Sequence, residues 1–216
     1  METLFALTNV DFAYGPDRPT LSGISMTLDA NDRVALTGNN GSGKTTLLHA
    51  LVGLNKPQQG EIHAFGRQRR TEKDFYEVRL RAGLLFEDSD DQLFCATVAE
   101  DVAFGPFNLG WPRERVAAAV DSTLARLGLS HSRDLSAAEL SHGEKRMAAL
   151  ATLLAMNPAA LLLDEPTNGM DQAHIDVLIQ TLQDTEAALL IASHDHAFLK
   201  RIARRSLRLE NGRIAS

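Results

Sequence analysis

The chain has 216 residues, 44% of them hydrophobic, and a formal net charge of −6, which fits one large domain or a core with an inserted subdomain. The acidic balance argues against general nucleic-acid binding, and the single Cys95 excludes an internal disulfide and favours a reducing cytoplasm. The longest apolar stretch, 147–163, contains Asn157-Pro158 and therefore cannot form one membrane span.

Several short segments read as β-strands, because they alternate in polarity or are continuously apolar. In chain order these segments are 4–7, 10–14, 21–28, 33–37, 60–66, 82–86, 160–163 and 188–192. The continuously apolar ones suit the interior of a sheet that is covered on both faces. Between 95 and 150 the spacing changes to three and four residues, which predicts helices over 113–127 and 144–156. Near the end, Asn211-Gly212 predicts a tight hairpin.

A glycine-rich loop, Gly38–Thr45, joins the strand 33–37 to a predicted helix start. Glycines let successive backbone N–H groups turn inward around a phosphate, and the helix N-terminus adds partial positive charge. Lysine at this position reaches the β- and γ-phosphates, and the following threonine hydroxyl ligates Mg²⁺. An ordinary glycine-rich turn is the alternative, but the flanking strand and helix favour a nucleoside triphosphate site. Its predicted contacts are Asn39, Asn40, Gly41, Ser42, Gly43, Lys44, Thr45 and Thr46.

Two carboxylates end the apolar strand 160–163. Asp164 is expected beside the phosphate loop, where it would hold Mg²⁺ through water, and Glu165 is the natural general base for an attacking water. A solvated Asp-Glu-Pro turn is the alternative. His194 ends the next apolar strand and is expected to hydrogen-bond the γ-phosphate and that water, although a lone histidine at a strand end is more often structural. Lys44, Glu165 and His194 are therefore the predicted catalytic residues.

Ser141 precedes a predicted helix and is a good N-cap, so its hydroxyl and the first N–H groups of the helix form a second candidate anion site. Taken alone, this segment indicates only a capped helix. The phosphate loop, the Asp-Glu strand end, the Leu-Ser-x-Gly cap and the strand-end Ser-His-Asp occur in an order and spacing that resemble the nucleotide-binding subunit of an ABC transporter. The resemblance covers essentially the whole chain.

That resemblance implies an α/β fold of the P-loop NTPase class. A mostly parallel core with an antiparallel N-terminal β-subdomain (about 1–90 and 157–216) would carry an inserted helical subdomain (about 91–156), all within one domain, 1–216. In the family two subunits form a head-to-tail dimer with ATP and Mg²⁺ sandwiched between them. The second subunit here is either another copy or a paralogue.

The resemblance also assigns residues to the dimer. Ser141 and Gly143 would contact the partner's γ-phosphate, from a signature segment that also contains His142 and Glu144. Asp171 would lie in a loop that crosses the interface. Tyr14 falls where the family stacks an aromatic ring on adenine; a half-buried edge-strand tyrosine is the alternative.

A narrower resemblance, to the ATPases of energy-coupling-factor importers, rests on 84–94 and 100–106. Those importers take up vitamins, cobalt or nickel, and their ATPases receive an integral membrane coupling subunit at these segments. Phe94, Phe104 and Phe107 would then form a docking rim, with burial in the helical core as the alternative. The implied location is the cytoplasmic face of the cell membrane.

Three positions depart from the family pattern. Glu87 stands where glutamine is usual, and we expect it to keep ligating Mg²⁺, with Thr45 and Asp164, while altering coupling to the membrane subunit. His142 and Glu144 replace a glycine and a glutamine of the signature.

The function expected from the sequence is ATP hydrolysis that powers an importer of cobalt or nickel ions, with biotin or another vitamin as alternative cargo. A soluble ABC ATPase acting on nucleic acid or ribosomes is less favoured, because the basic stretches 67–70 and 200–205 lie in an acidic chain. A regulatory module that binds ATP without hydrolysing it is disfavoured by Glu165 and His194.

Overall fold

The structure, a computed structural model, describes residues 2–15 and 19–215. By its internal contacts the chain forms two compact units, one of Met1–Leu84, Ala159–Asp164 and Glu186–Ser216, the other of Leu85–Pro158 and Glu165–Thr185. The subdomain limits expected near 91 and 156 stay a prediction. In the described part of the chain, no helix has the length and apolar character needed to cross a membrane.

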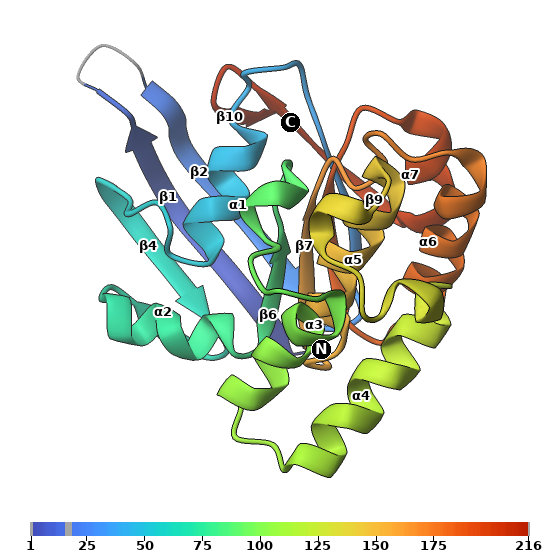
Figure 1. Ribbon diagram of the computed structural model, residues 1–216. Coiled ribbons are helices and arrows are strands. Elements are labelled where there is room, and N and C mark those ends of the chain that lie inside the picture. Colours follow the sequence, from blue (N-terminus) through green and yellow to red (C-terminus); the bar gives the residue numbers. More distant parts are fainter. Residues whose placement is uncertain (1, 16–18, 216) are drawn as a thin grey trace. The chain divides into compact units, whose positions relative to one another are not determined.

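The first unit begins with an antiparallel sheet in the order β2-β1-β4-β5 (Figure 1). Its core residues are apolar side chains on one face of the long strands, such as Phe5, Leu7 and Ile24, as the alternating pattern predicts. The strand bounds are β1 Thr3–Ala13, β2 Pro19–Asp29, β4 Gln59–Ala64 and β5 Arg67–Arg69.

A second, six-stranded sheet has the order β10-β9-β3-β8-β7-β6. Strands β7, β8, β3 and β9 are parallel, and β10 returns antiparallel to β9 through Asn211 and Gly212, both of which have positive φ. Every residue of β7 and β8 is buried, as the continuously apolar runs predicted. The bounds are β3 Arg33–Thr37, β6 Ala82–Leu85, β7 Ala160–Asp164, β8 Ala188–Ala192, β9 Arg205–Glu210 and β10 Arg213–Ala215.

Helices α1 (Lys44–Leu51), α2 (Glu72–Arg79) and α7 (His196–Ile202) belong to the first unit. The second unit is helical: its α-helices are α3 Val98–Asn108, α4 Arg113–Arg126, α5 His142–Leu154 and α6 Gln172–Asp184. Short 3₁₀ turns occupy Ser89–Asp91, Ser130–Ser132 and Ala137–Glu139. The α/β architecture with an antiparallel sheet and a largely parallel sheet is as predicted.

Helices α2, α6 and α7 and strand β5 were not predicted from the sequence, and burial of three phenylalanines in the helical core, the stated alternative to a docking rim, is wrong. Helix α6 carries Leu178, Ile179 and Leu182 buried at helical spacing, a signal that was available. Phe94, Phe104 and Phe107 are 66%, 49% and 50% exposed, so they are not core residues. Val98 and Val102 form the buried side of α3 instead.

Candidate nucleotide site

The glycine-rich loop between β3 and α1 is held tightly by neighbouring backbone. A Cβ on Gly38 would lie 2.2 Å from the carbonyl oxygen of Leu209, and one on Gly43 would lie 2.8 Å from that of Thr20. Both glycines also have positive φ, 149° and 106°. Only glycine satisfies both the close approach and the backbone conformation, which explains why positions 38 and 43 are glycines.

Polar groups of the loop remain available to an anion. Among the residues that the structure describes, no side chain caps the start of α1, where Gly43 occupies the N-cap position. Ser42 Oγ is buried and has no hydrogen-bond partner among the described residues. Lys44 Nζ donates to the carbonyl oxygens of Gly38 at 2.9 Å and Asn39 at 3.4 Å, which places the ammonium at the loop itself. Oriented N–H donors, a helix N-terminus and a lysine together suit phosphate oxygens.

The sheet brings two further predicted segments to the edge where this loop begins. Leu36 of β3 is level with Ala192 of β8, and Ala192 is level with Asp164 of β7. The three strands are parallel. The phosphate loop, Asp164 and the residues that follow Ala192 therefore all lie at the carboxyl edge of the sheet. Asp164 is buried and His194 is exposed. This row of strand ends is the geometric core of the candidate site.

Tyr14 follows β1 and is 65% exposed. Its hydroxyl lies 3.4 Å from Thr46 Oγ1 and accepts from Asn55 Nδ2 at 3.3 Å, while its ring meets that of Phe12 edge-on at 4.8 Å between centroids. The contacts fix the ring from two sides and leave much of it open, an arrangement suited to stacking on a flat base.

In the second unit, Glu165 is 6% exposed and has a φ of 44°, unusual for a residue with a side chain. Its carbonyl oxygen accepts a hydrogen bond from Arg146 Nη2 at 2.8 Å. Arg146 Nη1 also donates to the carbonyl oxygens of Phe86 and Glu87, the latter at 2.9 Å. One buried guanidinium of α5 therefore holds the backbone at two predicted site residues. Arg146 was not predicted as a site residue, although its position among the apolar residues of α5 was a visible signal.

Ser141 is the N-cap of α5, as predicted, and it forms a capping box with Glu144. The carboxylate of Glu144 accepts from Ser141 N at 2.9 Å and from Ser141 Oγ at 2.6 Å, and it lies 2.9 Å from His131 Nε2. These contacts, the Ser141 hydroxyl first, lower the pKa of Glu144 to about 2. Glu144 is thus a cap of the signature segment, a role that its replacement of glutamine did not suggest.

Glu144→Gln is expected to lower the free energy of unfolding at pH 7 by about 1 kcal/mol, because an amide keeps the box but loses the charge-assisted hydrogen bonds. A carboxylate whose pKa is lower in the folded chain stabilises above its unfolded value, near 4.5, and loses that contribution as the pH falls toward 2. Urea unfolding of both proteins at pH 7, 4 and 3 measures this. If the difference in unfolding free energy between the two proteins did not shrink as the pH fell from 7 to 3, the stabilising role of the Glu144 carboxylate would be contradicted.

The other predicted residues of the second unit have separate surroundings. The Glu87 side chain is exposed. Asp171 is the N-cap of α6 and accepts from the backbone N–H of His174 at 2.9 Å, and His142 opens α5 with its ring against Gly169. The nucleotide and trans-contact roles predicted for these three residues stay predictions.

Hard oxygen ligands suited to Mg²⁺ occur in the first unit. Three side chains offer this donor type: the buried hydroxyl of Ser42, which has no hydrogen-bond partner among the described residues, the hydroxyl of the half-buried Thr45 in the first turn of α1, and the carboxylate of Asp164. No group of three or more His, Cys, Asp or Glu side chains in residues 2–15 and 19–215 gathers as a metal cage. Such a donor set fits an ion whose remaining ligands are phosphate oxygens and water.

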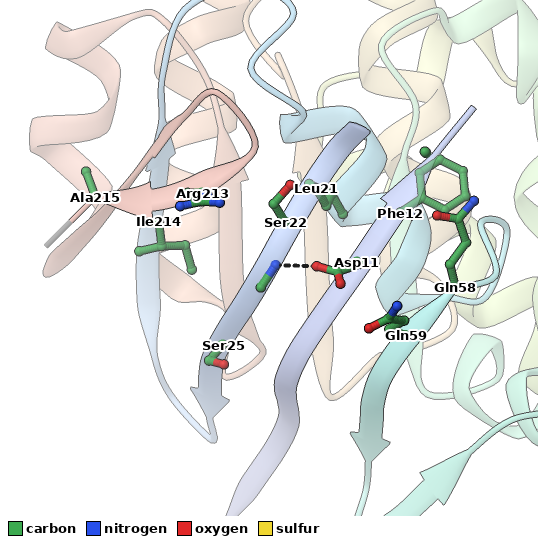
Figure 2. Close-up of a pocket in the computed structure, with 12 residues that line it drawn as sticks. Asp11, Phe12, Leu21, Ser22, Ser25, Gln58, Gln59, Arg213, Ile214 and Ala215 are labelled. Atoms are coloured by element: carbon green, nitrogen blue, oxygen red, sulfur yellow. Dashed lines mark hydrogen bonds between the residues drawn. The ribbon is translucent and has the colours of Figure 1, made fainter. Parts of the chain in front are cut away.

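A hollow of about 890 Å³ lies elsewhere in the first unit, where β1, β2 and β10 meet (Figure 2). Its polar lining includes Asp11, whose Oδ1 accepts from the N–H of Gly23, as well as Gln59 and Arg213. None of the twelve lining residues belongs to Gly38–Thr45. This hollow is therefore separate from the phosphate loop.

Comparison with known proteins agrees with this geometry. Residues 21–168 match the family described as ABC transporter. The energy-coupling factor transporter ATP-binding protein EcfA of Methanothermobacter thermautotrophicus is 38% identical over 98% of this chain and 69% of its own length. The nickel import ATP-binding protein NikO of Rhodobacter capsulatus is 40% identical over all of this chain and 89% of its own.

Among solved structures, cbiO1 from Clostridium perfringens, part of the ABC transporter complex cbiONQ, superposes with a TM-score of 0.87. It is 30% identical, and the alignment covers all of this chain and 88% of that one. The match spans the phosphate loop, both sheets and the helical unit. The chain belongs to the ABC transporter family and is an ATPase, an ATP-binding subunit of the kind that serves transporters.

Proposed function

We propose that this ATPase powers an energy-coupling-factor type importer and that its cargo is nickel or cobalt ions. The row of strand ends, with the phosphate loop, Asp164 and His194 at one edge of the sheet, carries the ATPase part of the proposal. The importer class is supported by the similarity to EcfA, and the metal cargo by the similarity to a nickel import protein. A vitamin such as biotin is the alternative cargo.

In the proposed reaction the loop N–H groups and Lys44 bind the triphosphate, and Tyr14 stacks on the adenine. Mg²⁺, held by Thr45 and Asp164, would neutralise charge on the β- and γ-phosphates. Glu165 orients and polarises the attacking water, and His194 hydrogen-bonds the γ-phosphate from another side. Ser141 and Gly143 would act on the nucleotide of a second subunit, either another copy or a paralogue.

The partner in the membrane would dock on exposed aromatic side chains of the second unit. The rings of Phe94 and Phe104 pack edge-on, 5.0 Å between centroids, and both remain about half exposed or more, as does Phe107. Aromatic rings in contact with water favour burial in an interface. We propose that they receive the integral membrane subunit, which would hold the chain at the cytoplasmic face of the membrane.

Glu87 is proposed to ligate Mg²⁺ and to tune coupling, since a carboxylate binds the ion more strongly than the usual amide but adds negative charge near the γ-phosphate. Glu87→Gln should therefore change the metal dependence of the ATPase or the ratio of uptake to hydrolysis. Unchanged hydrolysis, metal dependence and uptake would remove this role.

Uptake of labelled Ni²⁺, Co²⁺ and biotin, in cells with and without the chain, tests the cargo. We expect metal uptake to be lost without the chain, restored by the wild type and not by Lys44→Ala, because that variant removes the loop ammonium. Loss of biotin uptake alone would establish the alternative cargo. Unchanged uptake of all three would contradict the proposed role in an importer. Co-purification with RNA or DNA in place of membrane proteins would contradict the proposed membrane partner.

A further inference from the structure

Two histidine rings join the start of α5 to the segment that leads into α6. The ring of His142, the first residue of α5, lies so close to Gly169 that a Cβ there would be 2.0 Å from His142 Cδ2 and 2.5 Å from Nε2. Gly169 also has a φ of 71°. The His142 ring can therefore lie this close to residue 169 only because residue 169 is a glycine.

The second contact runs in the opposite direction. A Cβ on the buried Gly143 of α5 would lie 3.1 to 3.4 Å from ring atoms of His174, which belongs to α6. That ring is oriented by Asp171, whose Oδ1 is 2.8 Å from His174 Nδ1 and accepts from the His174 N–H at 2.9 Å. The His142 ring of α5 thus packs on Gly169 before α6, and the His174 ring of α6 packs on Gly143 of α5.

We propose that these reciprocal contacts hold the signature segment and the loop 168–171 as one rigid part, with His142 as a positioning residue for catalysis. The inference rests on the proposed function, in which both segments face the nucleotide of a second subunit. Because each ring lies against the backbone of a glycine in the other segment, neither segment can shift without displacing a ring. Ser141 and Gly143 would therefore reach the γ-phosphate in a fixed relation to Asp171, and His142 would set that relation without touching the nucleotide.

A double-mutant cycle on His142 and Gly169 tests the coupling. In Gly169→Ala the new methyl must displace the ring of His142, which is an exposed residue. We expect Gly169→Ala and His142→Ala each to lower kcat for MgATP about tenfold, with KM changed less than about twofold, and the double variant to be no more than about twofold below either single variant. His196→Ala, at an exposed position of α7, is the matched control and should keep the wild-type kcat.

An equal loss from Gly169→Ala in the wild-type background and in the His142→Ala background would overturn the proposal, because backbone strain at the positive φ alone would explain it. Amide hydrogen exchange of 168–171 provides a second measurement that needs neither a folded Gly169→Ala variant nor a membrane partner. His142→Ala should speed exchange there about fivefold or more, and His196→Ala should not. Unchanged exchange would also overturn the proposal, whereas absent uptake with intact coupling would count only against the proposed function.

Discussion

Glu165→Gln is expected to lower the ATPase rate about a thousandfold while ATP binding persists, because an amide cannot accept a proton from the attacking water. The substitution conserves shape, and the backbone hydrogen bond that Arg146 donates to residue 165 is independent of the side chain. Single-turnover phosphate release measures the chemical step, and nucleotide binding is measured separately.

The same variant is expected to accumulate as an ATP-bound dimer, since the dimer of the proposed function reopens only after hydrolysis. Size-exclusion chromatography with and without ATP would detect it. Glu186→Gln, at an exposed position before β8, is the matched control and should hydrolyse ATP normally. Hydrolysis by Glu165→Gln within about tenfold of the wild type would remove Glu165 from the role of general base.

The strands and the phosphate loop were predictable because each depends on local pattern. Continuous apolar runs of four or five residues marked β7 and β8, and the glycine spacing of 38–43 between a strand and a helix marked the phosphate loop. The contacts that require glycine at 38 and 43, with Leu209 and Thr20, were not visible in the sequence. The strand ends were also predictable, since parallel strands place their carboxyl ends at one edge. Pattern and topology agree in this unit, so the strand ends were predictable without the register of the sheet.

The second unit was less predictable because its critical contacts join residues far apart in sequence. Arg146 donates to carbonyl groups some 60 residues before it and 19 residues after it, and no periodicity marks the acceptors. The pairing of His142 with Gly169 was hidden for the same reason: the substitution in the signature was visible, but the glycine that accommodates it lies in another loop. Glu144 was seen as a departure from the family, whereas the capping box shows what it does locally.

Arg146→Met is expected to lower the free energy of unfolding by about 3–5 kcal/mol, because it leaves the carbonyl groups of Phe86, Glu87 and Glu165 without their shared donor. Methionine fills similar volume, so most of the loss would come from the hydrogen bonds that Arg146 donates and little from a cavity. Urea unfolding measures this loss of stability, and an unchanged m-value would show that the unfolding transition is otherwise the same.

The matched control for Arg146→Met is Arg133→Met, which removes an arginine paired with Asp121 and Asp134 at the surface. That change should cost no more than about 1 kcal/mol, because exposed ion pairs contribute little. The folded fraction of Arg146→Met should also hydrolyse ATP slowly, since the unusual backbone conformation at Glu165 loses one of its hydrogen bonds. If both arginine variants were equally stable and active, the guanidinium of Arg146 would neither stabilise the fold nor position Glu165.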